Sequence, residues 1–158
     1  MHRTDQETRR HCTAQNQECY SFIMNSRLAV ATHVLTLLAY EQRALTSNDI
    51  AASVNTNPVA IRRALGALRA ARLVRSQPGP GGGWQLLRAP DAITLRDVQR
   101  IVDAGLPFRT HDEPNRRCPI GRRIAPALQG TFERAQQALE KELARTTIAD
   151  MLRRLMKS

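Results

Sequence analysis

One stretch, residues 54–87, decides the fold: "VNTNPVAIRRALGALRAARLVRSQPGPGGGWQLL". Asn57 and Pro58 are typical of the start of an α-helix, because an Asn side chain accepts a free backbone N–H and Pro has no N–H to leave unpaired. The helix is expected to run to about residue 72. The segment "QPGPGGG" that follows a short apolar run is too rich in proline and glycine for a helix. The stretch therefore predicts a helix followed by a two-stranded hairpin with a glycine-rich tip.

The predicted helix has two different faces when its residues are placed at ~3.6 per turn. The face expected to be buried carries Ile61, Leu65 and Leu68. The opposite face combines small residues with arginine: Val59, Arg63, Gly66 and Ala70, with Arg62 at its flank. Such a face lets a partner approach closely and offers it positive charge.

Two further helices are predicted upstream, where apolar residues recur at helical spacing. The first covers residues 25–42 and the second covers residues 46–54. Thr46 and Asp49 stand three positions apart, close to a capping box in which Asp replaces the usual Glu. The turn "NTN" that links the second helix to the third is short and polar.

Downstream of the third helix, short strands are predicted over residues 73–76 and 84–87, and another helix from Thr94. A long helix is expected over residues 119–143, and the segment "TTIADMLRRLM" predicts a short last one. The long helix repeats apolar residues in the manner of a coiled-coil seam. These residues are Ile124, Leu128, Phe132, Ala135, Leu139 and Leu143.

Charge and composition narrow the class of protein. The chain of 158 residues has a net charge of +10, an excess that favours polyanionic partners, nucleic acid first and acidic membrane surfaces second. No apolar run approaches the ~20 residues that span a bilayer, and the N-terminus lacks the apolar region of an export signal. Three cysteines, an odd number, argue against a disulfide framework. We therefore expect a cytoplasmic protein without a membrane partner.

Three short helices followed by a hairpin form the order of a winged helix-turn-helix. The DNA major groove admits one helix, whose N-terminus and positive dipole end suit phosphate. Arg62 and Arg63 can contact guanine edges or phosphates, and a glycine-rich wing lets backbone amides lie against the sugar-phosphate chain. The pattern thus predicts double-stranded DNA as a partner. Two alternatives stay open: a sequence-independent DNA-binding protein and a winged-helix module that binds other proteins.

The segment "LRAARLVRSQPGPGGGWQLLRAPDAITLRDV" resembles the diagnostic pattern of the Rrf2 family of winged-helix transcription regulators, the family of IscR, NsrR and CymR. Two positions depart from that pattern, since Ala71 replaces a common glycine and Pro78 replaces a frequent arginine of the wing. The resemblance covers residues 24–155, and "NTNPVAIRR" with "CPIGRRI" is most similar to members that lack the iron–sulfur cysteine triad. It implies a homodimer, joined through the long helix, that acts on a palindromic operator as a repressor.

With this resemblance the fold class is mainly α with a small β-hairpin, a winged helix-turn-helix followed by a long C-terminal dimerisation helix. Residues 1–23 are polar and aperiodic, and we expect them to be disordered. The DNA-binding domain is expected over residues 24–104 and a loop of the sensor type over 105–118. The dimerisation helix and the C-terminal helix then occupy residues 119–158.

The DNA contacts are expected from three parts of the winged domain. The start of the third helix would enter the major groove, the wing would contact the backbone, and the starts of the first two helices would bind phosphates. The residues in that order are Asn57, Val59, Arg62 and Arg63; Gly81, Gly82 and Gly83; and Ser26, Arg27, Thr46 and Ser47.

Cys118 is the one cysteine in the predicted sensor loop, which also contains His111. Members of the family that bind an iron–sulfur cluster use three cysteines there, so we expect no cluster and no other cofactor or metal. Cys118 precedes the long helix among arginines, an environment that lowers a thiol pKa and favours a redox or electrophile switch. The alternative is a small apolar residue without a signalling role. No catalytic motif such as HExxH is present, so we do not expect an enzyme.

Overall fold

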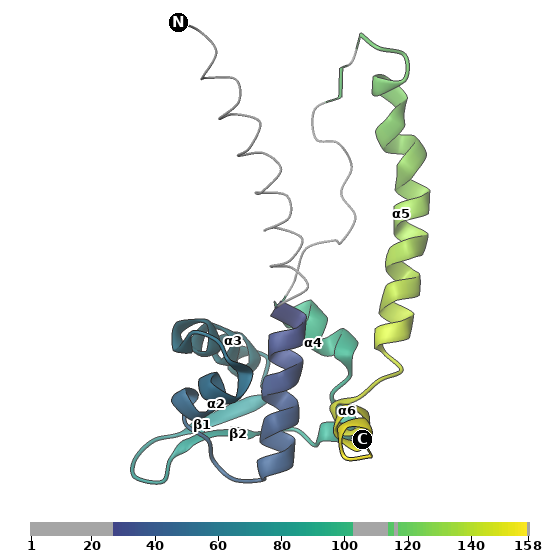
Figure 1. Ribbon diagram of the computed structural model, residues 1–158. Helices are drawn as coiled ribbons and strands as arrows, with labels where there is room; N and C mark the ends of the chain where they lie inside the picture. Colours follow the sequence, from purple (N-terminus) through teal and green to yellow (C-terminus); the bar gives the residue numbers. More distant parts are fainter. Residues whose placement is uncertain (1–26, 103–113, 116, 158) are drawn as a thin grey trace, which may run out of the picture.

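The computed structural model describes residues 27–102, 114–115 and 117–157 (Figure 1). The expected disorder of residues 1–23, the expected phosphate contact of Ser26, and most of the predicted loop over 105–118 lie outside the described residues. The described part is mainly helical, with one two-stranded sheet. This confirms the predicted fold class.

The winged domain begins with a helix over residues 27–41, followed by α2 (Ser47–Val54) and α3 (Pro58–Ala70). Thr46 and Asp49 form the predicted capping box at the start of α2. Asn57 caps α3, where its Oδ1 accepts the N–H of Val59 at 2.8 Å. Polar side chains therefore fix where both helices begin, as the sequence predicts.

The core lies between the first helix and α3. Ile61, Leu65 and Leu68 are fully buried, as predicted from their spacing. They belong to one cluster with Leu35 and other apolar side chains of the first helix, α2 and α4. Full burial of each such side chain stabilises the fold by ~1.5–3 kcal/mol, so this stripe fixes how α3 is rotated about its axis.

The wing consists of β1 (Val74–Gln77) and β2 (Gly83–Leu86), which pair antiparallel with Val74 opposite Leu86. Both strands are displaced by one residue from the predicted 73–76 and 84–87. The backbone N–H of Leu73 donates to the carbonyl of Leu68 at 2.9 Å, so Leu73 still belongs to the end of α3. Gly83 pairs with Gln77 and thereby starts β2 one residue early.

The C-terminal half comprises the short 3-10 helix η1 (Pro90–Ala92), α4 (Leu95–Val102), α5 (Gly121–Leu143) and α6 (Ile148–Leu155). Thr94 and Thr147, which precede α4 and α6, each bond to an Asp three residues later, as Thr46 does before α2. An isolated antiparallel bridge joins Thr94 to Thr147. The chain thus returns to the start of α4 before it enters α6.

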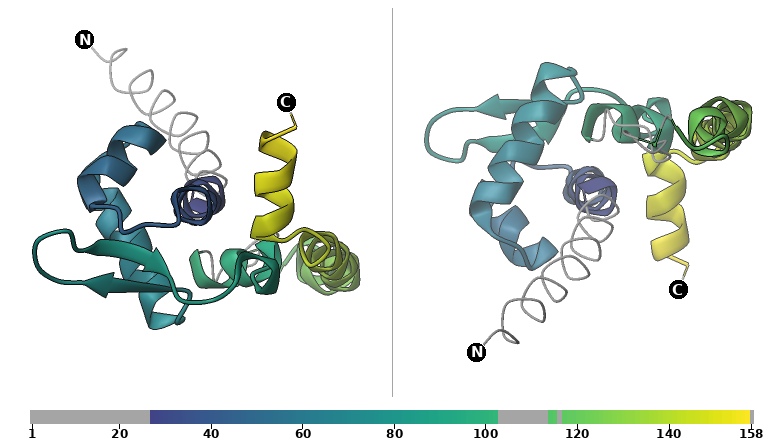
Figure 2. Two further views of the ribbon diagram at one scale, coloured as in Figure 1. Left: turned by 90° about the horizontal axis from the view of Figure 1, so that it is seen from below. Right: turned by 90° about the horizontal axis from the view of Figure 1, so that it is seen from above.

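Helix α5 extends away from the winged domain, while α6 lies between the first helix and α5 (Figures 1 and 2). Viewed from above or below, the first helix and α5 are both seen end-on, so they run nearly parallel (Figure 2). Arg100 of α4 forms an ion pair with Glu140 near the C-terminal end of α5. No side chain of α5 is buried by the rest of the described chain.

At the root of the wing, the backbone at position 83 requires glycine. Gly83 has φ +153°, and a Cβ built on it would lie 2.5 Å from the carbonyl oxygen of Leu45. We expect Gly83→Ala to lower the free energy of unfolding by ~1–3 kcal/mol, measured by urea denaturation followed by circular dichroism.

Gly66→Ala is the matched control. A Cβ at Gly66 would meet nothing within 4 Å, and the residue lies inside a helix, so this substitution is expected to stabilise the protein by up to ~1 kcal/mol. Equal effects of the two substitutions would contradict the close approach of Gly83 to Leu45.

Candidate nucleic-acid interface

The outer face of α3 presents positive charge that the described chain does not neutralise. Arg62 and Arg63 are exposed, and neither forms an ion pair with another described residue. The helix Pro58–Ala70 contains three arginines and no acidic residue. Both cations are therefore available to an external anion.

The first turn of α3 combines this charge with an exposed apolar residue. The side-chain oxygen of Asn57 is engaged by the N–H of Val59, so its amide NH₂ is the part that remains for a partner. Val59 is 47% exposed, so its methyl groups are accessible to a partner. The positive end of the helix dipole adds to the field at this position. A groove that displays phosphates, acceptors and methyl groups complements such a surface.

Trp84 holds the wing against the segment that precedes α2 and against α3. Its backbone exchanges two hydrogen bonds with Leu45, at 3.1 and 2.8 Å. The guanidinium of Arg69 lies over its ring, 5.9 Å from the centroid. This cation–π contact joins α3 directly to β2 and holds the wing beside α3.

Sequence reasoning missed Leu45 and Arg69 as positioning residues. Nothing in their local sequence indicates the contacts, since both depend on how β2 packs across the domain. The one signal for these contacts in the sequence is Trp84 directly after the glycine run, because a large aromatic side chain at the root of a wing is expected to pack against another element.

The three wing glycines have different surroundings. The N–H of Gly82 donates to the carbonyl of Gly79 at 2.9 Å, and Gly83 lies against Leu45 and pairs with Gln77. Gly81 is at the tip, where a Cβ would meet nothing within 4 Å. Gly82 and Gly83 therefore shape the hairpin, and of the three only Gly81 presents an open backbone.

The phosphate contacts expected at Thr46, Ser47 and Arg27 also differ. The hydroxyl of Thr46 donates to Asp49 Oδ2 at 2.7 Å and accepts the Asp49 N–H at 3.2 Å. The hydroxyl of Thr46 and its backbone N–H, which lies 3.2 Å from Asp49 Oδ2, both donate to the Asp49 carboxylate and lower its pKa. The ionised carboxylate therefore holds the hydroxyl hydrogen of Thr46. Ser47 is half-buried and Arg27 is exposed, which makes Arg27 the more accessible donor to a phosphate.

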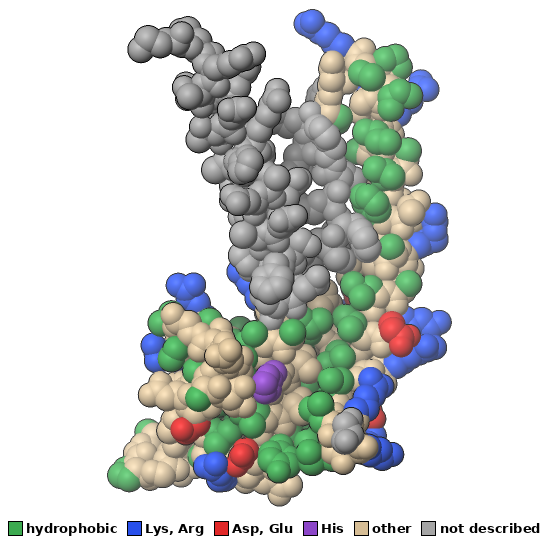
Figure 3. All heavy atoms as spheres, in the orientation of Figure 1, with side chains coloured by type: hydrophobic (Ala, Val, Ile, Leu, Met, Phe, Trp, Pro, Cys, Tyr) green, Lys and Arg blue, Asp and Glu red, His purple; other side chains and the backbone are tan. Residues whose placement is uncertain are grey.

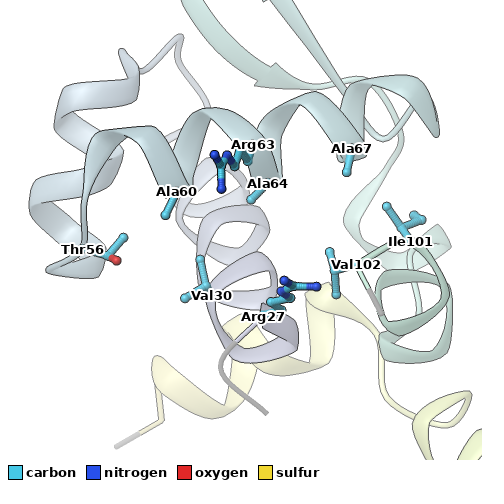
Figure 4. A pocket seen from close by; sticks show the side chains of 9 residues that line it. All are labelled: Arg27, Val30, Thr56, Ala60, Arg63, Ala64, Ala67, Ile101 and Val102. Atoms are coloured by element: carbon cyan, nitrogen blue, oxygen red, sulfur yellow. The ribbon is translucent and has the colours of Figure 1, made fainter. Parts of the chain in front are cut away.

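Arg27 and Arg63 line the same hollow, between the first helix, α3 and α4 (Figure 4). The hollow has a volume of about 410 Å³, and its other lining residues are mostly apolar. Both arginines are predicted DNA contacts, but their spacing in the sequence does not indicate that they share a cavity.

Cys118 lies just before α5 and is half-buried. The backbone N–H groups of Gly121 and Ile120 donate to its sulfur and lower the pKa of the thiol. The direction agrees with expectation, and of the two expected causes it is the start of the helix, not the nearby arginines, that lowers the pKa. The geometry stabilises a thiolate at this position.

Residues 24–154 match the Rrf2 family model, which is described as "Iron-dependent Transcriptional regulator". The described residues do not fit an iron site, because they contain no group of three or more His, Cys, Asp or Glu side chains that could hold a metal ion. Cys118 is also the only cysteine between residue 20 and the C-terminus. No helix within the described ranges is long and apolar enough to cross a membrane.

Individual relatives agree with this match. The chain is 41% identical over 134 residues to the Bacillus subtilis protein named "Putative HTH-type transcriptional regulator YwnA", covering 84% of this chain and 99% of the relative. A solved structure described as "Crystal structure of a putative DNA binding protein" is 38% identical, with a TM-score of 0.66 over 80% of this chain and 98% of the other. Staphylococcus aureus CymR is 25% identical, with a TM-score of 0.62 over 80% and 95% of the two chains. The predicted family is confirmed: this chain belongs to the Rrf2 family of transcriptional regulators.

Proposed function

We propose that this regulator binds double-stranded DNA in a sequence-specific manner through the N-terminal half of α3. The observation that carries the proposal is the acid-free outer face of α3, on which Arg62 and Arg63 are exposed without an ion pair to any described residue. Such a surface is stabilised by an external polyanion, and a single helix fits the major groove.

The two arginines are expected to have different roles. Arg63 lies opposite the buried stripe of α3. In the proposed complex it would face the centre of the groove, where a guanidinium can form two hydrogen bonds with guanine. Arg62 lies on the flank nearer the wing, where backbone phosphates are within reach. Asn57 and Val59 complete the base contacts, and Gly81 brings the wing tip to the neighbouring backbone.

We also propose that the active form is a homodimer joined through α5. Ile124, Leu128, Leu139 and their neighbours form an apolar stripe that no other described element buries, and Figure 3 shows hydrophobic side chains along α5. A second apolar surface is a groove of about 660 Å³ between the first helix and α6. Its rim includes Tyr40, Leu155 and Met156, which are 55%, 57% and 61% exposed.

A two-fold dimer places one α5 stripe near the groove of the other subunit, so that each apolar surface is covered. Two α3 helices about one helical turn of DNA apart, ~34 Å, then match a palindromic operator. On this basis we place the protein in the cytoplasm as a repressor, which acts by occupying a promoter.

Two alternative functions predict different DNA-binding behaviour. A sequence-independent DNA-binding protein would bind operator and scrambled duplexes equally, whereas the proposed regulator is expected to prefer its operator by ~10³-fold or more at fixed salt. A protein-binding module would show negligible DNA affinity and no salt dependence. The duplex upstream of the coding region is the natural first candidate for an operator.

We propose that Cys118 modulates this activity. A thiolate at the start of α5 reacts readily, and its modification would disturb the first turn of the helix that we expect to join the dimer. The alternative, an apolar residue without a signalling role, predicts that alkylation of Cys118 leaves DNA binding unchanged.

Arg63→Ala is expected to weaken operator binding by ~1–3 kcal/mol and to relax the preference at one base pair, because it removes a bidentate base contact. The measurement is fluorescence anisotropy with the operator and its single-base variants. Arg122→Ala on α5 is the control with the same change of charge, and it should leave affinity nearly unchanged. Equal weakening on all duplexes would make Arg63 a phosphate contact.

Leu139→Asp is expected to convert the dimer to a monomer, because it places a carboxylate in the apolar stripe of α5. Size-exclusion chromatography with light scattering measures the mass, and operator affinity should fall with it. Gln137→Asp, on the opposite face of α5, is the control and should remain dimeric. A wild-type protein that is monomeric at micromolar concentration would refute the dimer.

Cys118 is expected to be alkylated by iodoacetamide with a midpoint pH below the ordinary thiol pKa of ~8.5, since the N–H groups of Gly121 and Ile120 favour its thiolate. The rate is measured against pH in a Cys12→Ser, Cys19→Ser background. The same protein in denaturant is the control, where the helix is lost and the midpoint should rise. Identical midpoints would exclude activation by the fold.

A further inference from the structure

The hollow between the first helix, α3 and α4 has the size and lining of a small-molecule site (Figure 4). Its volume of about 410 Å³ is in the range of ligand pockets, ~300–1,000 Å³. Val30 lines it from the first helix, and Ile101 and Val102 line it from α4. These three side chains give it apolar walls from two elements.

The space exists because α3 presents only methyl groups on this flank. Ala60, Ala64 and Ala67 recur at positions i, i+4 and i+7 and all line the hollow. Larger side chains at these positions would fill it. The flank is separate from the apolar stripe that packs into the core, so the hollow is not a packing requirement of the fold.

Two cations complete the lining, and none of the described residues that line it is acidic. Arg27 enters from the start of the first described helix and Arg63 from α3 (Figure 4). Neither arginine forms an ion pair with a residue in the described part of the chain. A guanidinium beside an apolar wall complements a carboxylate attached to a hydrocarbon body.

We propose that this hollow binds a small organic carboxylate, and that the carboxylate is the effector of the regulator. The hydrocarbon part contacts Val30 and Val102, and the acid group faces the guanidinium groups of Arg27 and Arg63. Its effector role rests on the proposed function, because Arg63 is also the expected base contact. A bound carboxylate withdraws that side chain from DNA, so ligand and operator compete for one charge.

Direct binding is tested first, without DNA, by the ¹⁵N spectrum of the full-length chain. Hexanoate and benzoate are the probes, and each is expected to shift signals of α3 and α4 with a Kd of about 1 mM or tighter. Hexan-1-ol lacks the charge and inorganic phosphate lacks the apolar body, so each should bind at least ~tenfold more weakly. Failure of both carboxylates to bind, or equally tight binding of either control, overturns the site.

Ala64→Leu separates the site from the DNA contact, because a leucine there would extend into the hollow while Ala64 itself is not among the expected DNA-binding residues. It should abolish carboxylate binding and leave operator affinity within about twofold of wild type. Ala67→Leu serves the same purpose if the first variant unfolds, as judged by circular dichroism. Carboxylate binding that survives in a folded variant overturns the assignment of the ligand to this hollow.

Competition is tested with the operator. A saturating carboxylate should weaken binding by the wild-type protein about tenfold and reduce the slope of log affinity against log salt by about one. The Ala64→Leu variant should show neither effect. Carboxylate binding without any change in operator affinity overturns the effector role. A protein that binds the carboxylates but no DNA refutes the proposed function and leaves the site intact.

Discussion

The burial of Ile61, Leu65 and Leu68 against the first helix is the constraint on which the rest of the molecule depends. An α-helix is rigid about its axis, so fixing one face fixes all the others. Once these three side chains are buried, Arg63 must lie on the outer side, Arg69 must face the wing, and the alanine flank must face α4. The rotation of α3 about its axis therefore determines the charged surface, the contact of Arg69 with Trp84 and the position of the hollow.

The wing depends on the same helix in a second way. Its sheet has only two strands, and an isolated hairpin is marginally stable in water. Two contacts of Trp84 stabilise this hairpin. Trp84 pairs with Leu45 in the segment before α2, and its ring lies under Arg69 of α3. Gly83 permits this pairing because no side chain separates the two backbones. The distance between the wing and α3 is therefore set by packing at the root of the wing and not by its glycine-rich tip.

Local signals predicted much of this structure. Asn57, Pro58 and the Thr46–Asp49 box place the helix starts correctly, and apolar spacing identifies the core face of α3. Strand limits were missed by one residue because Leu73 completes the helix end, a backbone contact that no spacing pattern records. The distinct roles of the wing glycines and the cavity shared by Arg27 and Arg63 depend on elements far apart in sequence, so local sequence patterns could not predict them.

The bridge between Thr94 and Thr147 has a consequence for how the molecule is divided. Because Thr94 and Thr147 pair with each other, the chain between them leaves the winged domain and returns to it at the same place. Ile148, just beyond the return, is fully buried in the core of the winged domain. Since α4 also packs into that core through Val98, it is α5 that can change in length or sequence over generations while the winged domain keeps its shape.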